Sequence, residues 1–259
     1  MSILLFFLII LFSGCDSQSC PESDCSPNYC SGHGSCHVTN RGDSYCVCDK
    51  NYRSRAEFIC AYVPDTNNTK PIIYLYPQEK SWIQVAFSEP ENIELTHTYP
   101  VYPEGGWEVI ASPDGTLEDP LTKRMYYALY WEGITNLKIF VDTGFVVKGE
   151  DIIGFLEEKL EKLGLNSIEA NEFIIYWLPI LEANPYNLIH FATSEWEEVA
   201  KLRVTPEPDT VIRFSMLYKE VDEKFEITEQ QLSPRPERTG FVLVEWGGRE
   251  LPDELAGGN

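Results

Sequence analysis

All eight cysteines of this 259-residue chain lie between Cys15 and Cys60. Cysteine can form disulfides, bind a metal or act as a nucleophile, and the redox compartment decides which of these is available. Residues 3–12 form an apolar run that is too short to span a bilayer but fits the core of a secretory signal. We therefore expect an exported chain whose cysteines form disulfides.

The tripeptide Ser13-Gly14-Cys15 places two small residues directly before a cysteine at the end of this apolar run. This order resembles the signal of bacterial lipoproteins, which implies that residues 1–14 are a signal peptide and that Cys15 is lipidated. The mature chain would then be anchored to the bacterial cell envelope. Cysteine parity favours the alternative, an extracellular chain in which Cys15 pairs with Cys20, because lipidation leaves seven cysteines and one without a partner.

The remaining cysteines follow a regular spacing, Cys25-x4-Cys30-x5-Cys36-x9-Cys46-x-Cys48-x11-Cys60. A segment this small buries too little apolar surface to fold alone, so crosslinks worth about 2–4 kcal/mol each are expected to stabilise it. Spacing alone leaves many pairings open. The spacing, together with the Gly-rich approach to Cys36, resembles an EGF-like module over about residues 20–60. The resemblance implies the disulfides Cys25–Cys36, Cys30–Cys46 and Cys48–Cys60.

Two histidines, His33 and His37, lie close to Cys36 and raise the question of a zinc site. In an exported chain, however, cysteine is better used in disulfides than as a metal ligand. We therefore predict neither a bound metal nor a cofactor.

The chain carries 20 Lys+Arg against 41 Asp+Glu, a net charge of −21. Such an acidic chain lacks the clustered cations that nucleic acids or anionic membranes require, so we expect neither as a partner of its surface. The acidic excess and all six tryptophans lie after residue 70. A polar stretch bracketed by prolines precedes that block. We assign residues 15–62 to the cysteine-rich module, 63–70 to a linker and 71–259 to an acidic domain.

Hydrolytic chemistry in the acidic domain would need carboxylates or a histidine. Two carboxylates about 5–10 Å apart can hydrolyse a glycosidic bond, and the candidates near the predicted helix starts are Glu150, Asp151, Glu169 and Glu172. The helix dipole favours acids at these positions without any catalytic role. A nucleophile–histidine site would require Ser194 or Ser215 to approach His190, and nothing in their spacing predicts this.

The elements that must position these residues can be predicted from periodicity. Alternating apolar residues indicate strands at residues 72–76, 83–87, 93–99, 126–131, 145–147, 188–191, 211–217 and 241–246. Apolar residues at helical spacing predict one helix from Asp151 to Gly164. A second helix begins with an Asn166/Glu169 capping box, and Pro179 is expected to kink or end it. The order predicts an α+β domain with one mainly antiparallel sheet and an inserted helical pair.

Three segments of this domain, at residues 70–77, 144–151 and 169–179, resemble an uncharacterised family of bacterial secreted or envelope proteins. The resemblance covers most of residues 70–248. It implies a domain boundary near residue 70 and no particular activity.

Two functions remain open. The first is an exported, envelope-anchored EGF-like-domain protein that binds a surface protein or a glycan, an interpretation favoured because the sequence contains no recognisable catalytic motif. The alternative is a secreted hydrolase with its site in residues 71–259. A cavity at His190, or convergent carboxylates with raised pKa values, would favour the hydrolase, whereas an exposed aromatic patch would favour binding.

Overall fold

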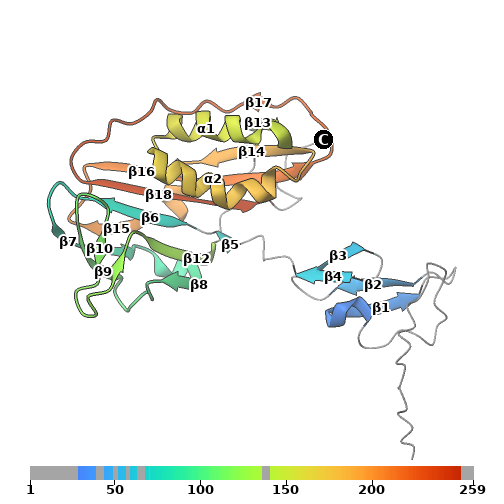
Figure 1. Ribbon diagram of the computed structural model, residues 1–259, viewed down its shortest axis with the longest axis horizontal. Coiled ribbons are helices and arrows are strands. Elements are labelled where there is room, and N and C mark those ends of the chain that lie inside the picture. Colours follow the sequence, from blue (N-terminus) through green and yellow to red (C-terminus); the bar gives the residue numbers. More distant parts are fainter. Residues whose placement is uncertain are drawn as a thin grey trace, which may run out of the picture. The chain divides into compact units, whose positions relative to one another are not determined.

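The computed structural model describes residues 29–38, 44–48, 52–56, 59–62, 68–69, 71–135 and 141–251 (Figure 1). The chain divides into two compact units, Met1–Asp65 and Thr66–Asn259. The expected signal peptide, Cys15 and Cys20 lie outside the described residues.

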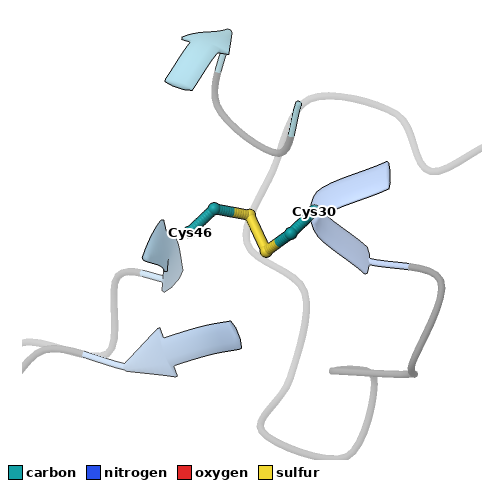
Figure 2. The surroundings of a disulfide bond; sticks show 2 residues. All are labelled: Cys30 and Cys46. Atoms are coloured by element: carbon teal, nitrogen blue, oxygen red, sulfur yellow. A yellow bond between two sulfur atoms is a disulfide. The ribbon is translucent and has the colours of Figure 1, made fainter. Parts of the chain in front are cut away.

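The N-terminal unit contains two antiparallel pairs of short strands and a disulfide. Its elements are η1 (Tyr29–Gly32), β1 (Gly34–Val38), β2 (Ser44–Cys48), β3 (Tyr52–Ala56) and β4 (Ile59–Tyr62). Strands β1 and β2 pair antiparallel, as do β3 and β4. The disulfide Cys30–Cys46 joins η1 to β2 (Figure 2). Cys36 and Cys48 are also disulfide-bonded, but their expected partners Cys25 and Cys60 have side chains outside the described part of the chain.

The second unit contains a large, mainly antiparallel sheet. Its strand order is β17 (Thr228–Glu229), β13 (Thr143–Lys148), β14 (Tyr186–Ala192), β16 (Thr210–Val221), β18 (Val242–Glu250), β6 (Ile72–Tyr76), β12 (Leu129–Thr135) and β5 (Asn68–Thr69), and β8 (Ile93–Tyr99) also pairs with β12. Among the described strands, the parallel pairs are β13–β17 and β16–β18. Strand β5 lies within the stretch expected to be a linker and extends this sheet.

A second sheet corrects the expectation of a single one. It is antiparallel and has the order β11 (Met125–Tyr126), β10 (Leu117–Glu118), β9 (Trp107–Ala111), β7 (Ser81–Phe87) and β15 (Leu202–Thr205). Alternation along a strand shows which side chains are buried but not which strand lies beside it. Strands β16 and β18 are buried on both faces, as expected for a sheet covered on both sides.

Two helices, α1 (Ile152–Leu163) and α2 (Ser167–Leu181), lie side by side over one face of the large sheet (Figure 1). Helix α1 ends at Gly164, whose φ of 102° provides the expected left-handed C-cap. Three short helical elements complete the unit: η2 (Pro90–Asn92), η3 (Gly149–Asp151) and α3 (Ser194–Val199). Within the described part of the chain, no helix combines the length and apolar character needed to cross a membrane.

The N-terminus of α2 has the predicted capping box. The Asn166 side-chain oxygen accepts hydrogen bonds from the backbone N–H groups of Ile168 and Glu169, at 2.9 and 3.0 Å. Glu169 Oε2 accepts one from the Asn166 backbone N–H at 2.8 Å. Of the two expected effects of Pro179, a kink or an end of the helix, the second does not occur at this residue, because α2 continues to Leu181. Pro179 lies in the last turn, where its missing N–H removes only one helical hydrogen bond.

The large sheet separates two hydrophobic cores. One core lies between the two sheets and contains Trp107, Trp131 and Trp196. The other lies beneath the helices, where Phe173, Trp177 and Leu181 of α2 form the predicted apolar face. Phe173 and Trp177 therefore pack in the core, as the helical spacing indicated.

A buried carboxylate lies in the core between the sheets. Glu245 of β18 is fully buried, and its Oε1 accepts a hydrogen bond from Trp131 Nε1 at 3.0 Å. Its Oε2 accepts hydrogen bonds from Trp196 Nε1 at 2.9 Å and from Arg213 Nε at 2.8 Å. An unpaired charge in this position would be very costly, so these partners must be in place when the core forms. The network joins β18, β12, α3 and β16.

The capping box yields a stability prediction. Replacing Asn166 by Ala should lower the free energy of unfolding by about 1–2 kcal/mol, because two N–H groups of α2 lose their acceptor. Denaturant unfolding of the full chain, followed by tryptophan fluorescence, measures this in the second unit. Ser167→Ala, at an exposed position of the same turn, is the control and should change stability by less than about 0.5 kcal/mol. Equal losses in both variants would contradict the capping role.

Candidate functional site

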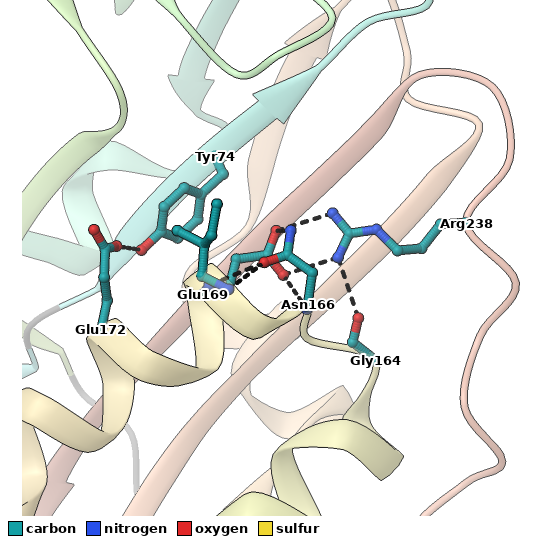
Figure 3. A network of polar contacts seen from close by, with 7 residues as sticks. Tyr74, Gly164, Asn166, Glu169, Glu172 and Arg238 are labelled. Carbon is teal, nitrogen blue, oxygen red and sulfur yellow. Dashed lines mark hydrogen bonds and ion pairs between the residues drawn. The ribbon is translucent and has the colours of Figure 1, made fainter.

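Glu169, one of the carboxylates considered for catalysis, is committed to a structural ion pair. Its side chain is fully buried and accepts hydrogen bonds from Arg238 Nη1 and Nη2 at 2.8 and 2.9 Å (Figure 3). Arg238 Nη1 also donates to the backbone oxygen of Gly164 at 3.2 Å. This bidentate pair ties the turn between α1 and α2 to the segment that precedes β18.

Glu172, on the next turn of α2, accepts a hydrogen bond from the Tyr74 hydroxyl (Figure 3). Burial raises the pKa of Tyr74 well above its usual range, and the hydrogen bond to Glu172 raises it further. The pKa of Tyr76 is also raised, first by burial and then by the charge of Glu169. Both tyrosine hydroxyls thus stay protonated beside an acidic neighbour, Glu172 for Tyr74 and Glu169 for Tyr76. These contacts link β6 to α2.

The other two candidate carboxylates are exposed. Glu150 pairs with Lys148 at 2.5 Å, and Asp151 precedes α1 without a side-chain capping hydrogen bond. Of the cavities lined by described residues, one lies beside β13 and another beside β15. None of the four candidate carboxylates lines either of these cavities.

His190 lies on β14, facing the core between the sheets. Its Nδ1–H donates to the backbone oxygen of Thr143 at 2.8 Å, and its Nε2 is buried with no hydrogen-bond partner in the structure as described. The β14–β16 register makes Ser215 a diagonal neighbour on the same face, with a buried and equally unpartnered hydroxyl. No hydrogen bond joins the two side chains, and His190 lines neither cavity.

Ser194, the other candidate nucleophile, is exposed at the start of α3, where its hydroxyl donates to Glu195 at 3.3 Å. In the N-terminal unit, the His37 ring stacks on Tyr45 with 5.7 Å between ring centroids. No group of three or more metal-ligating side chains converges anywhere in the described ranges.

The most distinctive exposed feature is a cluster of tyrosine rings around an arginine. Tyr99, at the end of β8, and Tyr126 of β11 pack edge to face with 5.4 Å between ring centroids. The Arg124 guanidinium lies 5.7 and 5.9 Å from these two centroids. Cation–π contacts of this kind contribute about 0.5–1 kcal/mol at exposed sites, so Arg124 is held over the rings rather than extended into solvent.

Further apolar side chains flank this cluster along the chain. Val101 is 80% exposed, Met125 55% and Tyr127 62%, while Tyr99 itself is 51% exposed. We use the name tyrosine surface for the three residues shown in contact, Tyr99, Arg124 and Tyr126.

The loop that carries Arg124 is fixed by Asp119. The Asp119 carboxylate accepts hydrogen bonds from the backbone N–H groups of Leu121 and Thr122, at 2.9 and 2.7 Å. The Asp119 backbone N–H donates to the Arg124 oxygen at 2.9 Å. These contacts lower the pKa of Asp119, first through the Thr122 N–H. The sequence analysis did not single out this site, because Tyr99 and Arg124 come together only through the pairing of different strands.

Comparisons with known proteins add no family or fold relationship. No family model matches the chain, and no curated protein and no solved structure shows significant similarity to it. The geometry of the chain itself is therefore the basis for proposing a function.

The Tyr74–Glu172 contact predicts an alkaline pH dependence. A tyrosine whose folded-state pKa is raised stabilises the fold fully below the unfolded pKa of about 10, and this contribution is lost as pH rises above it. The free energy of unfolding of the wild type should therefore fall above about pH 10. Tyr74→Phe should fall less steeply, because it lacks the ionisable hydroxyl. Denaturant unfolding at a series of alkaline pH values measures both slopes, and identical slopes would contradict the assignment.

Proposed function

We propose that this chain is an exported protein, anchored at the bacterial cell envelope through Cys15, that binds a partner protein at the cell surface. The Cys30–Cys46 disulfide supports export, because such bonds persist in oxidising compartments and are rare in the cytosol. The EGF-like N-terminal unit would act as a crosslinked spacer between the lipid anchor and the acidic domain.

The tyrosine surface is the observation that carries this proposal. Tyrosine, arginine and methionine are enriched in the cores and hot spots of protein interfaces. Tyr99, Arg124 and Tyr126 already contact one another, and Asp119 holds their loop, so little conformational entropy is lost on binding.

A protein partner fits this surface better than a glycan does. Tyrosine together with arginine is the combination enriched at the hot spots of protein interfaces. Val101 and Met125, close in sequence to Tyr99 and Tyr126, are further exposed apolar side chains. The secreted hydrolase is less well supported, because neither His190 nor any of the four candidate carboxylates lines the cavities beside β13 and β15.

Binding to cells tests the proposal. A soluble, fluorescently labelled Cys15→Ser form of the full chain is added to intact cells of the producing organism that lack their own copy. Saturable binding is expected, and protease treatment of the cells should abolish it. The double variant Tyr99→Ala/Arg124→Ala should bind at least about tenfold more weakly, because both residues are of the hot-spot type.

Trp82→Ala is the matched control. Trp82 is 45% exposed on β7 and is not part of the tyrosine surface, so its removal should leave binding unchanged. Equal binding by the wild type and the double variant would refute the role of the tyrosine surface. Binding that survives protease but is lost after glycosidase treatment would show that the partner is a glycan.

A further inference from the structure

A cavity opens between the edge of the small sheet and the large sheet. Its volume is about 410 Å³, within the range of small-ligand sites. Leu202 and Val204 of β15 line it together with Val211 and Arg213 of β16 and Leu243 of β18. The cavity is therefore mainly apolar and has a guanidinium in its wall.

The backbone of β15 offers free hydrogen-bonding groups along this cavity. Among the strands that the structure describes, β15 is at the end of its sheet and pairs with β7 alone. Ser88 N–H donates to the Lys201 oxygen at 2.8 Å, which makes these two residues a hydrogen-bonded antiparallel pair. Because such pairs alternate along the ladder, the backbone groups of Leu202 and Val204 point away from β7, toward the open edge.

Arg213 lies at one end of this open edge. Its side chain is only 5% exposed. Its Nε and Nη2 contact Glu245 Oε2 at 2.8 and 2.7 Å, and Nη2 also donates to the backbone oxygen of Ala200, just before β15. Its Nη1 has no hydrogen-bond partner among the residues that the structure describes. Arg213 lines the cavity, so its guanidinium can donate a charge-assisted hydrogen bond to a ligand carboxylate.

The charges around the cavity also favour an anion. Lys201 and Arg203 line the cavity together with one acid, Glu207. Lys201 already pairs with Glu89 at 3.1 Å, whereas no ion pair of Arg203 occurs within the described ranges. This local excess of cations contrasts with the net charge of −21 of the whole chain.

We propose that this edge binds the C-terminal end of an extended peptide. The peptide adds to β15 as a strand and pairs with the backbone groups of Leu202 and Val204. Its terminal carboxylate accepts from Arg213 Nη1, and its last apolar side chain fills the space beside Val211 and Leu243. Strand addition and carboxylate capture are both established modes of peptide recognition. Because Arg213 contacts Ala200, before the start of β15, the bound peptide must run antiparallel to β15.

This site is separate from the tyrosine surface, so the two proposals stand or fall independently. The test uses the full, disulfide-bonded chain and a pool of hexapeptides that are randomised except for an apolar last residue. Hydrogen exchange measured at the amides of Leu202 and Val204 reports strand addition directly. Protection of both amides is expected with the free-acid pool. The same degree of protection should require an about tenfold higher concentration of the pool with amidated C-termini, because the hydrogen bond to the charged carboxylate is lost.

Substitutions at Val211 separate the site from the stability of the fold. Val211 is 44% exposed, so Val211→Glu and Val211→Lys should both fold. The glutamate should repel the terminal carboxylate and weaken protection about tenfold or more. The lysine loses the same apolar contact but attracts the carboxylate, so it should weaken protection clearly less than the glutamate does. Arg213 itself is unsuitable for substitution in this test because its removal leaves Glu245 buried and unpaired.

Several results would overturn the proposal. These are the absence of protection with every pool, equal protection by free-acid and amidated pools, or equal effects of the two Val211 variants. Octanoate serves as a small carboxylate without a peptide backbone. If it shifts the nuclear magnetic resonance signals of the cavity residues while neither peptide pool protects the β15 amides, the cavity is a small-acid site and strand addition is refuted.

Discussion

The core between the two sheets of the second unit is built around one buried carboxylate, Glu245. It lies in the core between the two sheets and accepts hydrogen bonds from Trp131, Trp196 and Arg213, which come from three different elements. Since an isolated charge could not be buried there, the core can close only when all three donors are in position. Glu245 also holds Nε and Nη2 of Arg213, a residue that lines the cavity beside β15. The interaction that closes the core thus also shapes the proposed peptide site.

A second buried carboxylate has the corresponding role on the other face of the large sheet. Glu169 joins the N-terminus of α2 to Arg238, and Glu172 on the following turn accepts from Tyr74 of β6. The helical pair is therefore attached to the sheet by directional polar contacts as well as by apolar packing. Both carboxylates are engaged in these structural contacts. Most other acids are exposed, where a high net charge favours solubility.

How much of the fold and of the candidate site could be predicted from the sequence depends on how far apart along the chain the interacting residues lie. Helix α1, its Gly164 cap and the Asn166/Glu169 capping box are local, and the sequence predicted all of them. The second sheet was missed because strand alternation does not identify a partner strand. Trp131 and Glu245 are separated by 114 residues, and no periodicity relates them. Tyr99 and Arg124 likewise meet only after β8, β11 and β12 have assembled, so the tyrosine surface carried no sequence signal.

The most direct test of the central role of Glu245 is a double-mutant cycle of Glu245→Gln and Arg213→Met, measured as the free energy of unfolding of the full chain. Each single variant should lose about 3–5 kcal/mol, because it leaves one charged partner buried without the other. The double variant should lose clearly less than the sum of the two losses, which would give a coupling energy of at least about 1.5 kcal/mol. Additive losses, or single variants as stable as the wild type, would contradict the account.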